Sequence, residues 1–218
     1  MKHLRELQGK HLGADAYVIG SGQTLEHYDP AVFDGCLTIG VNQGWANHLD
    51  SVDYMVTKYH GNVEWWNSGR VGDLIVTRGI RGHLRDFIDE SPEYYVVDHN
   101  DNPVEAFTAD DWPDDEHALV ASHSSITTAM HLAAYMGARR IFTVAADCGT
   151  LDGHMTVEGH DRRQTTLNTL KSFDVQNSIV KAELEKRYDT TVIGLSPFPT
   201  PNMTGHVFES WAGRLDAS

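Results

Sequence analysis

The sequence predicts an α/β fold of the Rossmann-like type, with a mostly parallel sheet flanked by helices. Short runs rich in β-branched and aromatic residues recur along the chain, and segments with helical spacing of apolar residues lie between them. Such alternation is typical of strand–helix–strand units, in which successive strands run parallel. The 218 residues and 24.3 kDa suit one hydrophobic core, so we expect a single α/β domain over 1–218.

The first expected strand, AYVIG at 16–20, runs directly into a turn that contains two glycines. Further strands are expected at 36–42, 53–59, 73–77, 94–98, 140–147 and 191–195. Helices are expected at 79–90, at 165–188 and, most clearly, after 122–125, where serines offer N-terminal caps. In that helix apolar residues recur at helical spacing up to a glycine stop: Ile126, Ala129, Met130, Ala133 and Gly137.

Two segments show neither the residue pattern of a strand nor that of a helix. Residues 99–117 are acidic, polar and interrupted by prolines, which predicts a loop or a mobile lid. Residues 196–218 begin with three closely spaced prolines, so we expect an irregular C-terminal tail.

The composition narrows the classes of function. A formal charge of −14 disfavours a broad nucleic-acid surface or binding to anionic membranes, although it leaves room for one electropositive pocket. Two cysteines without a C-x-x-C pair support neither a disulfide scaffold nor a zinc ribbon. The N-terminal residues do not resemble a signal peptide and no apolar run approaches membrane-spanning length, so we expect a cytoplasmic protein.

Polar or glycine-rich residues follow three of the expected strands, at Gly20–Thr24, at Asn42 and at Asp147. In parallel sheets ligands bind beyond the carboxyl ends of the strands, so we expect these residues to share one site. The Gly20-Ser21-Gly22 turn would let backbone N–H groups approach a phosphate, or would serve the turn alone. The amide of Asn42 would bind a base or ribose, or would simply end the strand.

The segment VIGSGQTLEHYDPAVFDGCLTIGVNQ at 18–43 resembles the opening of two related groups of proteins. They are the bacterial CMP-sialic-acid-dependent sialyltransferases and the domain family that includes the archaeal 6-hydroxymethylpterin diphosphokinase. A second segment, SSITTAMHLAAYMGARRIFTVAADC at 124–148, resembles a later block of the same proteins, and the two segments cover roughly a quarter of the chain. The resemblance implies a nucleotide-binding site at Gly20, Ser21, Gly22, Thr24, Asn42, Ser124 and Ser125, although the two serines would also serve as helix caps.

The loop after the strand at 140–147 carries the candidate catalytic residues. Asp147 matches the aspartate of the resembling proteins, and the sialyltransferases among them use a histidine of this region to deprotonate the acceptor hydroxyl. The resemblance therefore implies that His154 or His160 is the general base. The same residue types would also ligate a metal, but their spacing matches no standard zinc or calcium motif, so we expect no resident metal.

The leading hypothesis is a glycosyltransferase that uses a nucleotide-sugar donor of the CMP type, an unidentified acceptor and no cofactor. A diphosphokinase that requires Mg²⁺ and acts on a hydroxymethyl acceptor is the alternative. Gln23 and Ile126 stand where the resembling proteins have proline and glycine. Because of these two differences, a non-catalytic nucleotide-binding module is a third hypothesis. The oligomeric state stays open, with a homodimer among the expectations.

Overall fold

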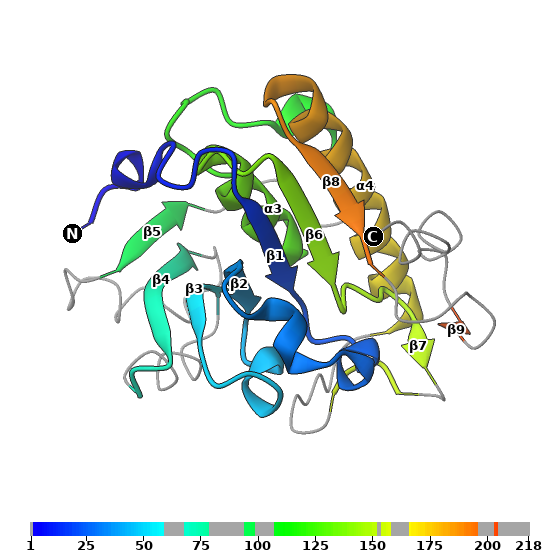
Figure 1. Cartoon of the computed structure of the whole chain (residues 1–218). Coiled ribbons are helices and arrows are strands. Elements are labelled where there is room, and N and C mark those ends of the chain that lie inside the picture. Colours follow the sequence, from blue (N-terminus) through cyan, green and yellow to red (C-terminus); the bar gives the residue numbers. More distant parts are fainter. Residues whose placement is uncertain are drawn as a thin grey trace.

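The computed structural model describes residues 2–58, 68–78, 94–98, 107–151, 154–157, 166–195 and 203–204. Within them a seven-stranded parallel sheet forms the centre of the protein (Figure 1). Its strands, in chain order, are β1 (Asp15–Ile19), β2 (Leu37–Val41), β3 (Val52–Thr57), β4 (Val71–Arg78), β5 (Tyr95–Asp98), β6 (Arg140–Val144) and β8 (Thr191–Gly194). Each lies where the sequence predicts a strand, and the α/β, Rossmann-like fold class is confirmed.

The strand order, β5-β4-β3-β2-β1-β6-β8, contains one reversal of direction. The chain builds the sheet outward from β1 to β5 and then returns to the other side of β1, where β6 and β8 are added. A crevice opens where such a sheet reverses, because the connections after the two central strands leave in opposite directions. Here that point lies beyond the carboxyl ends of β1 and β6.

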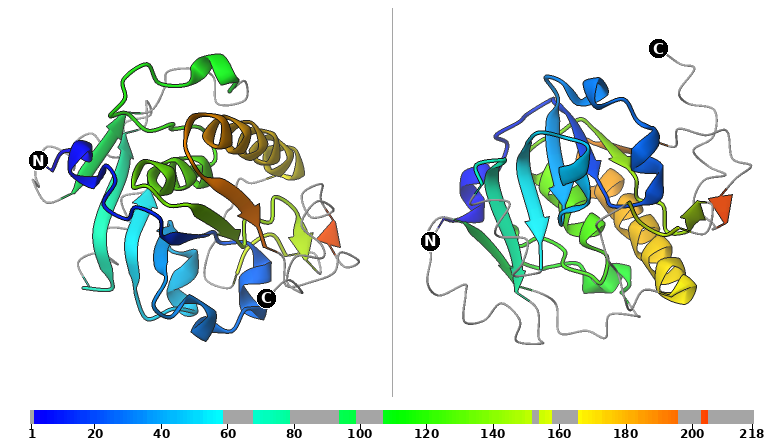
Figure 2. Two further views of the ribbon diagram at one scale, coloured as in Figure 1. Left: turned by 45° about the horizontal axis from the view of Figure 1, so that its top comes forward. Right: turned by 90° about the horizontal axis from the view of Figure 1, so that it is seen from below.

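Two helices, α3 (Ser125–Tyr135) and α4 (Leu167–Arg187), lie side by side on one face of the sheet (Figure 2). Ser124 is the N-cap of α3, and Gly137 follows its end with a φ of 88°, a left-handed conformation that glycine adopts without strain. The helix therefore begins and ends where the sequence predicts, but the side chain of Ser124 makes no capping hydrogen bond. Every residue of α3 is buried, since the helix is enclosed by the sheet and α4.

The sheet is buried on both faces by two hydrophobic clusters. Val18 and Val56 belong to the cluster beneath α3 and α4, whereas their neighbours Ile19 and Met55 belong to the other. The second cluster is completed by three short 3₁₀ helices, η2 (Gln23–His27), η3 (Pro30–Phe33) and η4 (Gly44–Asn47). Two further 3₁₀ helices are η1 (Leu4–Leu7) and η6 (Ala109–Asp111). Burial on both faces explains why the strands appear as near-continuous apolar runs.

Of three further sequence-based predictions, one lies wholly and two lie partly outside the described residues. The helix expected at 79–90 lies outside them, as do 99–106 of the expected lid. The remainder of that segment packs on α3 and α4 through Trp112, whose ring lies against His131 and under Arg187. In the expected tail, β9 (Met203–Thr204) pairs antiparallel with β7 (Thr150–Leu151), a short pairing that the irregular composition did not indicate.

The outer edge of β8 is covered by side chains of α4. The ammonium of Lys181 donates to the carbonyl of Val192 at 2.7 Å, and Glu185 accepts from the N–H of the same residue at 2.9 Å. Lys181 and Glu185 also form an ion pair with each other. At the opposite edge of the sheet, Lys2 forms an isolated parallel bridge with Tyr95 of β5.

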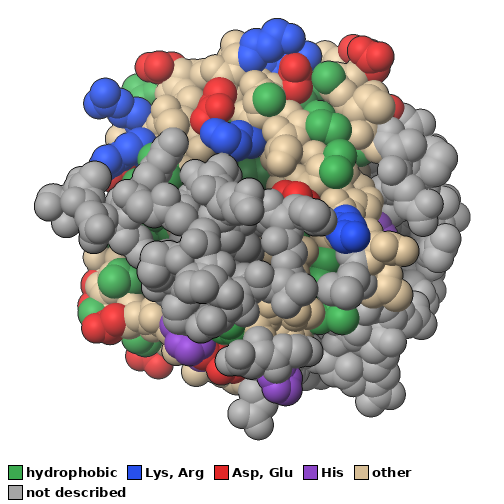
Figure 3. Space-filling view, turned by 90° about the vertical axis from the view of Figure 1, so that its right-hand side faces the viewer, with side chains coloured by type: hydrophobic (Ala, Val, Ile, Leu, Met, Phe, Trp, Pro, Cys, Tyr) green, Lys and Arg blue, Asp and Glu red, His purple; other side chains and the backbone are tan. Residues whose placement is uncertain are grey.

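The structure describes no helix that combines the length and the apolar character needed to span a bilayer. On the face shown in Figure 3, lysine and arginine side chains are interspersed with acidic ones over the part that is described.

Candidate active site

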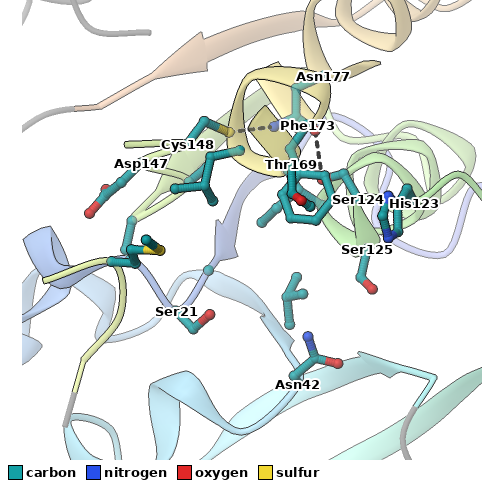
Figure 4. Close-up of a pocket in the computed structure, with 18 of the residues that line it drawn as sticks. Ser21, Asn42, His123, Ser124, Ser125, Asp147, Cys148, Thr169, Phe173 and Asn177 are labelled. Atoms are coloured by element: carbon teal, nitrogen blue, oxygen red, sulfur yellow. Dashed lines mark hydrogen bonds between the residues drawn. The ribbon is translucent and has the colours of Figure 1, made fainter. Parts of the chain in front are cut away.

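A polar cavity of about 300 Å³ opens beyond the carboxyl ends of β1, β2 and β6, at the point where the sheet reverses (Figure 4). Its walls come from the turns after these strands, from the end of β3, from the start of α3 and from one side of α4. The lining residues are Gly20, Ser21, Gly22, Val41, Asn42, Lys58, His123, Ser124, Ser125, Ile126, Ala145, Ala146, Asp147, Cys148, Met155, Thr169, Leu170, Phe173 and Asn177. Residues from all three polar strand ends singled out in the sequence therefore line one cavity.

The two glycines after β1 allow this turn to approach the turn after β6. A Cβ on Gly20 would lie 2.3 Å from the carbonyl oxygen of Ala145, and one on Gly22 would lie 2.3 Å from Cγ of Asp147. The N–H of Gly20 donates to Val144, and the N–H of Gly22 donates to Ala145, both at 2.8 Å. These two N–H groups are therefore occupied within the protein and the glycines serve close packing, which agrees with the structural one of the two interpretations open from the sequence.

Asp147 is buried and holds Thr24. One carboxylate oxygen accepts the backbone N–H of Thr24 at 2.9 Å, and the other accepts its hydroxyl at 2.5 Å. In Figure 4 the carboxylate of Asp147 points away from the centre of the cavity. These contacts favour a positioning role for Asp147 over the catalytic role expected from the sequence. Thr24 does not line the cavity and contributes through Asp147. Burial and, second, the negative charge of Asp147 raise the pKa of the nearby Tyr28 above its usual range.

Asn42 presents its side-chain amide to the cavity. Its carbonyl oxygen accepts the hydroxyl of Thr57 at 3.2 Å, and its backbone carbonyl accepts the indole N–H of Trp45 at 2.8 Å. These contacts orient the side chain, so that the NH₂ group points into the cavity in Figure 4. Asn42 therefore offers donors to a ligand from a buried, fixed position.

Three lining residues adopt left-handed backbone conformations that are costly for residues with a Cβ. Asn42 has a φ of 56°, Ala145 of 52° and Cys148 of 47°, and among the described residues no other non-glycine residue has a positive φ. Strain of this kind persists only where the surrounding structure enforces it, and it clusters at functional sites.

The N-terminus of α3 forms the wall opposite Asn42. The hydroxyl of Ser124 donates to the side-chain carbonyl of Asn177 on α4 at 2.9 Å, and the amide of Asn177 lies 3.5 Å from the sulfur of Cys148. Ser125 is 9% exposed, its hydroxyl makes no hydrogen bond to another described residue, and it points into the cavity (Figure 4). Ser124 therefore joins two walls, whereas Ser125 is open to a ligand.

The expected catalytic histidines do not lie among the cavity walls that the structure describes. His154 is exposed, and its backbone pairs with Leu151 in both directions at 2.9 Å. His160 lies outside the described residues. Among the described residues, the histidine that lines the cavity is His123, which precedes the cap of α3.

Lys58, Phe173 and Asn177 also line the cavity without having been predicted from the sequence. On α4 a signal was available, because Thr169, Phe173 and Asn177 recur every four residues and so share one side of the helix.

A larger cavity, of about 1070 Å³, lies at the opposite, amino-terminal ends of β2–β4. Its principal carboxylates are engaged within the protein, since Asp53 accepts from Thr38 and Asp73 pairs with Lys2. Because sites in parallel sheets lie at carboxyl ends, we assign the site to the smaller cavity. Among the described residues, no group of three or more histidine, cysteine or acidic side chains is arranged to hold a metal ion.

The fold is similar to that of a solved glycosyltransferase. The sialyltransferase CstII from Campylobacter jejuni, solved in complex with the substrate analogue CMP-3FNeuAc, superimposes with a TM-score of 0.52 at 13% sequence identity. The match covers 84% of this chain and 82% of that one. No protein-family model matches the chain, and no curated protein matches its sequence. At this identity the likeness shows the fold alone.

Proposed function

We propose that the protein is a glycosyltransferase that binds a nucleotide-sugar donor of the CMP type in the cavity beyond β1, β2 and β6. The observation that carries the proposal is that buried donor groups at the reversal point of the sheet face one another across the cavity. The NH₂ group of Asn42 lies on one side, and the hydroxyl of Ser125 lies on the other. The likeness of the fold to a sialyltransferase that binds a CMP-sugar analogue supports the choice of donor.

The anionic part of the donor would bind at the N-terminus of α3. The helix dipole places partial positive charge there, and an 11-residue helix is long enough to maintain it. Lys58 adds an ammonium group to the same cavity, where it donates to the carbonyl of His123 at 2.8 Å. Donor groups, a cation and a helix N-terminus all favour a phosphate or a carboxylate.

The other residues expected from the sequence would shape this site. Gly20 and Gly22 let the turn after β1 approach Asp147, and Ser21 lines the cavity between them. Thr24 fixes Asp147, and Ser124 fixes the start of α3. In the proposed reaction the acceptor hydroxyl attacks the anomeric carbon of the sugar, the nucleotide leaves with the electron pair of the broken C–O bond, and a histidine takes the proton.

Thermal unfolding of the full chain against CMP, UDP, GDP and ATP, each with Mg²⁺ and with EDTA, tests the proposal. At about 100 times its dissociation constant a ligand adds about 2.7 kcal/mol, which shifts the unfolding temperature of a chain this size by roughly 5–10 °C. We expect a shift selective for CMP that persists in EDTA. A shift with ATP that disappears in EDTA would favour the diphosphokinase, and no shift with any nucleotide would overturn the proposal.

A matched pair of variants locates the site. Ser125→Ala removes the open hydroxyl at the start of α3 and should weaken CMP binding by about 1–2 kcal/mol, roughly tenfold. Ser178→Ala is the control, since Ser178 is exposed on α4 and does not line the cavity. Equal affinities of the two variants for CMP would place the nucleotide elsewhere. If CMP binds but no CMP-sugar is turned over, a non-catalytic binding module is the better description.

A further inference from the structure

We infer that His123 is the catalytic base that takes the proton of the acceptor; this inference rests on the proposed function and identifies the histidine in it. The sequence did not predict His123 as a site residue, because it is only the residue before an expected helix cap. Of the histidines that the structure describes, it is the one whose residue lines the cavity.

The backbone of His123 is fixed from two sides. Its N–H donates to the side-chain carbonyl of Gln176 on α4 at 3.1 Å, and the same oxygen lies 3.4 Å from the N–H of Ser124. Its carbonyl oxygen accepts the ammonium of Lys58 at 2.8 Å. Gln176 is buried on α4 and Lys58 directly follows β3, so the peptide units on both sides of His123 are held by two different elements. A reacting group needs this kind of positioning.

The imidazole ring is also oriented by its surroundings. It meets the ring of Phe173 edge to face, with centroids 5.0 Å apart and planes at 88°. Phe173 lines the same cavity, and Figure 4 shows the His123 ring beside Ser125, whose hydroxyl we propose as a donor to the ligand. The ring therefore lies at the edge of the cavity, beside the N-terminus of α3 where we propose that the anionic part of the donor binds.

The other titratable side chains of the described cavity walls are Asp147, Lys58 and Cys148, and each already contacts another part of the protein. Both oxygens of Asp147 already accept hydrogen bonds from Thr24, Nζ of Lys58 donates to the carbonyl of His123, and the sulfur of Cys148 lies 3.5 Å from the amide of Asn177. An imidazole has an ordinary pKa of about 6.5 and can accept a proton at pH 7. In the step, the acceptor oxygen forms its bond to the anomeric carbon, the C–O bond to the phosphate breaks with its electron pair leaving on CMP, and the acceptor proton moves to the ring of His123.

The test uses the full chain with CMP-N-acetylneuraminic acid as donor and water as acceptor, and measures CMP release from pH 5 to 9. We expect His123→Gln to lower the rate by about 10²–10⁴-fold and to remove the decline of the rate at acidic pH. CMP binding, measured by thermal shift, should be retained. His123→Phe is the second variant, because it keeps an aromatic ring against Phe173 while removing the base. His3→Gln is the matched control, since His3 is exposed and lies outside the cavity lining.

The outcomes separate this inference from the proposed function. If wild-type protein releases CMP and both His123 variants stay within about threefold of it, the inference is overturned. A loss in His154→Gln or His160→Gln would then identify the base. If wild-type protein neither binds CMP nor releases it, the proposed function fails and the role of His123 fails with it.

Discussion

The carboxylate of Asp147, after β6, accepts both the backbone N–H and the hydroxyl of Thr24, which lies 123 positions earlier in the chain. The pair ties the turn after β1 to the turn after β6, at the point where the sheet reverses. Because the contact is buried and one partner is a carboxylate, its loss should cost more than that of an ordinary hydrogen bond.

We expect Asp147→Asn to lower the free energy of unfolding by about 1–3 kcal/mol, because an amide cannot accept from both groups with the same strength. Thr24→Val should cost a similar amount, and the double variant should cost less than the sum of the two. Urea denaturation measures all three, with Asp110→Asn, an exposed acid on η6, as the control. Additive effects would mean that the two residues act independently.

The left-handed backbone of Ala145 predicts an unusual response to glycine. Ala145 and Ala146 are adjacent and both buried, but of the two only Ala145 has a positive φ. Each change to glycine removes one methyl group and adds freedom to the unfolded chain, whereas Ala145→Gly also relieves the left-handed strain. We expect Ala145→Gly to be more stable than Ala146→Gly by about 1–2 kcal/mol in urea denaturation. Equal stabilities would show that the strain at position 145 is negligible.

A buried histidine predicts how stability depends on pH. His131, on α3, accepts the N–H of Val120 at Nδ1, and its Nε2 lies 2.8 Å from the hydroxyl of Tyr188. Burial and, second, the charge of Arg187 lower its pKa to about 3. In the unfolded chain this histidine has an ordinary pKa of about 6.5. Between about pH 3 and pH 6.5 the unfolded chain therefore binds a proton that the folded protein does not bind.

Between about pH 3 and pH 6.5 the unfolded state binds more protons than the folded state, so the free energy of unfolding should rise with pH. Above about pH 6.5 the contribution of His131 should be constant. The slope from His131 approaches about 1.4 kcal/mol per pH unit. His131→Gln should be less stable at pH 7, yet its stability should fall less steeply between pH 6 and pH 4. His3→Gln, which replaces an exposed histidine in the same way, is the control. A slope in His131→Gln equal to that of wild type would contradict the assignment.

Much of the fold could be predicted from the sequence because a parallel sheet buried on both faces requires continuous apolar runs. The fully buried β2 is one such run. The site was predictable to the extent that it follows strands: Gly20, Asn42 and Asp147 each follow one, and the rule for parallel sheets brings their ends together.

What could not be predicted depends on contacts between distant parts of the chain. No local pattern indicates that Asp147 is held by Thr24, and without that contact a buried carboxylate after a strand reads as a catalytic group. His123 is similar, because its position depends on Gln176, 53 positions later, and on Lys58, 65 positions earlier. The sequence directed attention to His154 and His160 because they lie in a polar loop, and no local pattern marks His123 as a residue of the cavity.

The ion pair of Lys181 and Glu185 bears on how two copies of the protein could associate. A strand at the rim of a sheet normally offers its free peptide groups to any neighbouring strand, and such pairing is a common route to dimers and to aggregation. At β8 those groups of Val192 are already occupied by the helix above it, and Lys2 bridges to β5 on the far rim. A strand from a second copy could therefore pair with Val192 only after Lys181 and Glu185 had been displaced from its peptide groups.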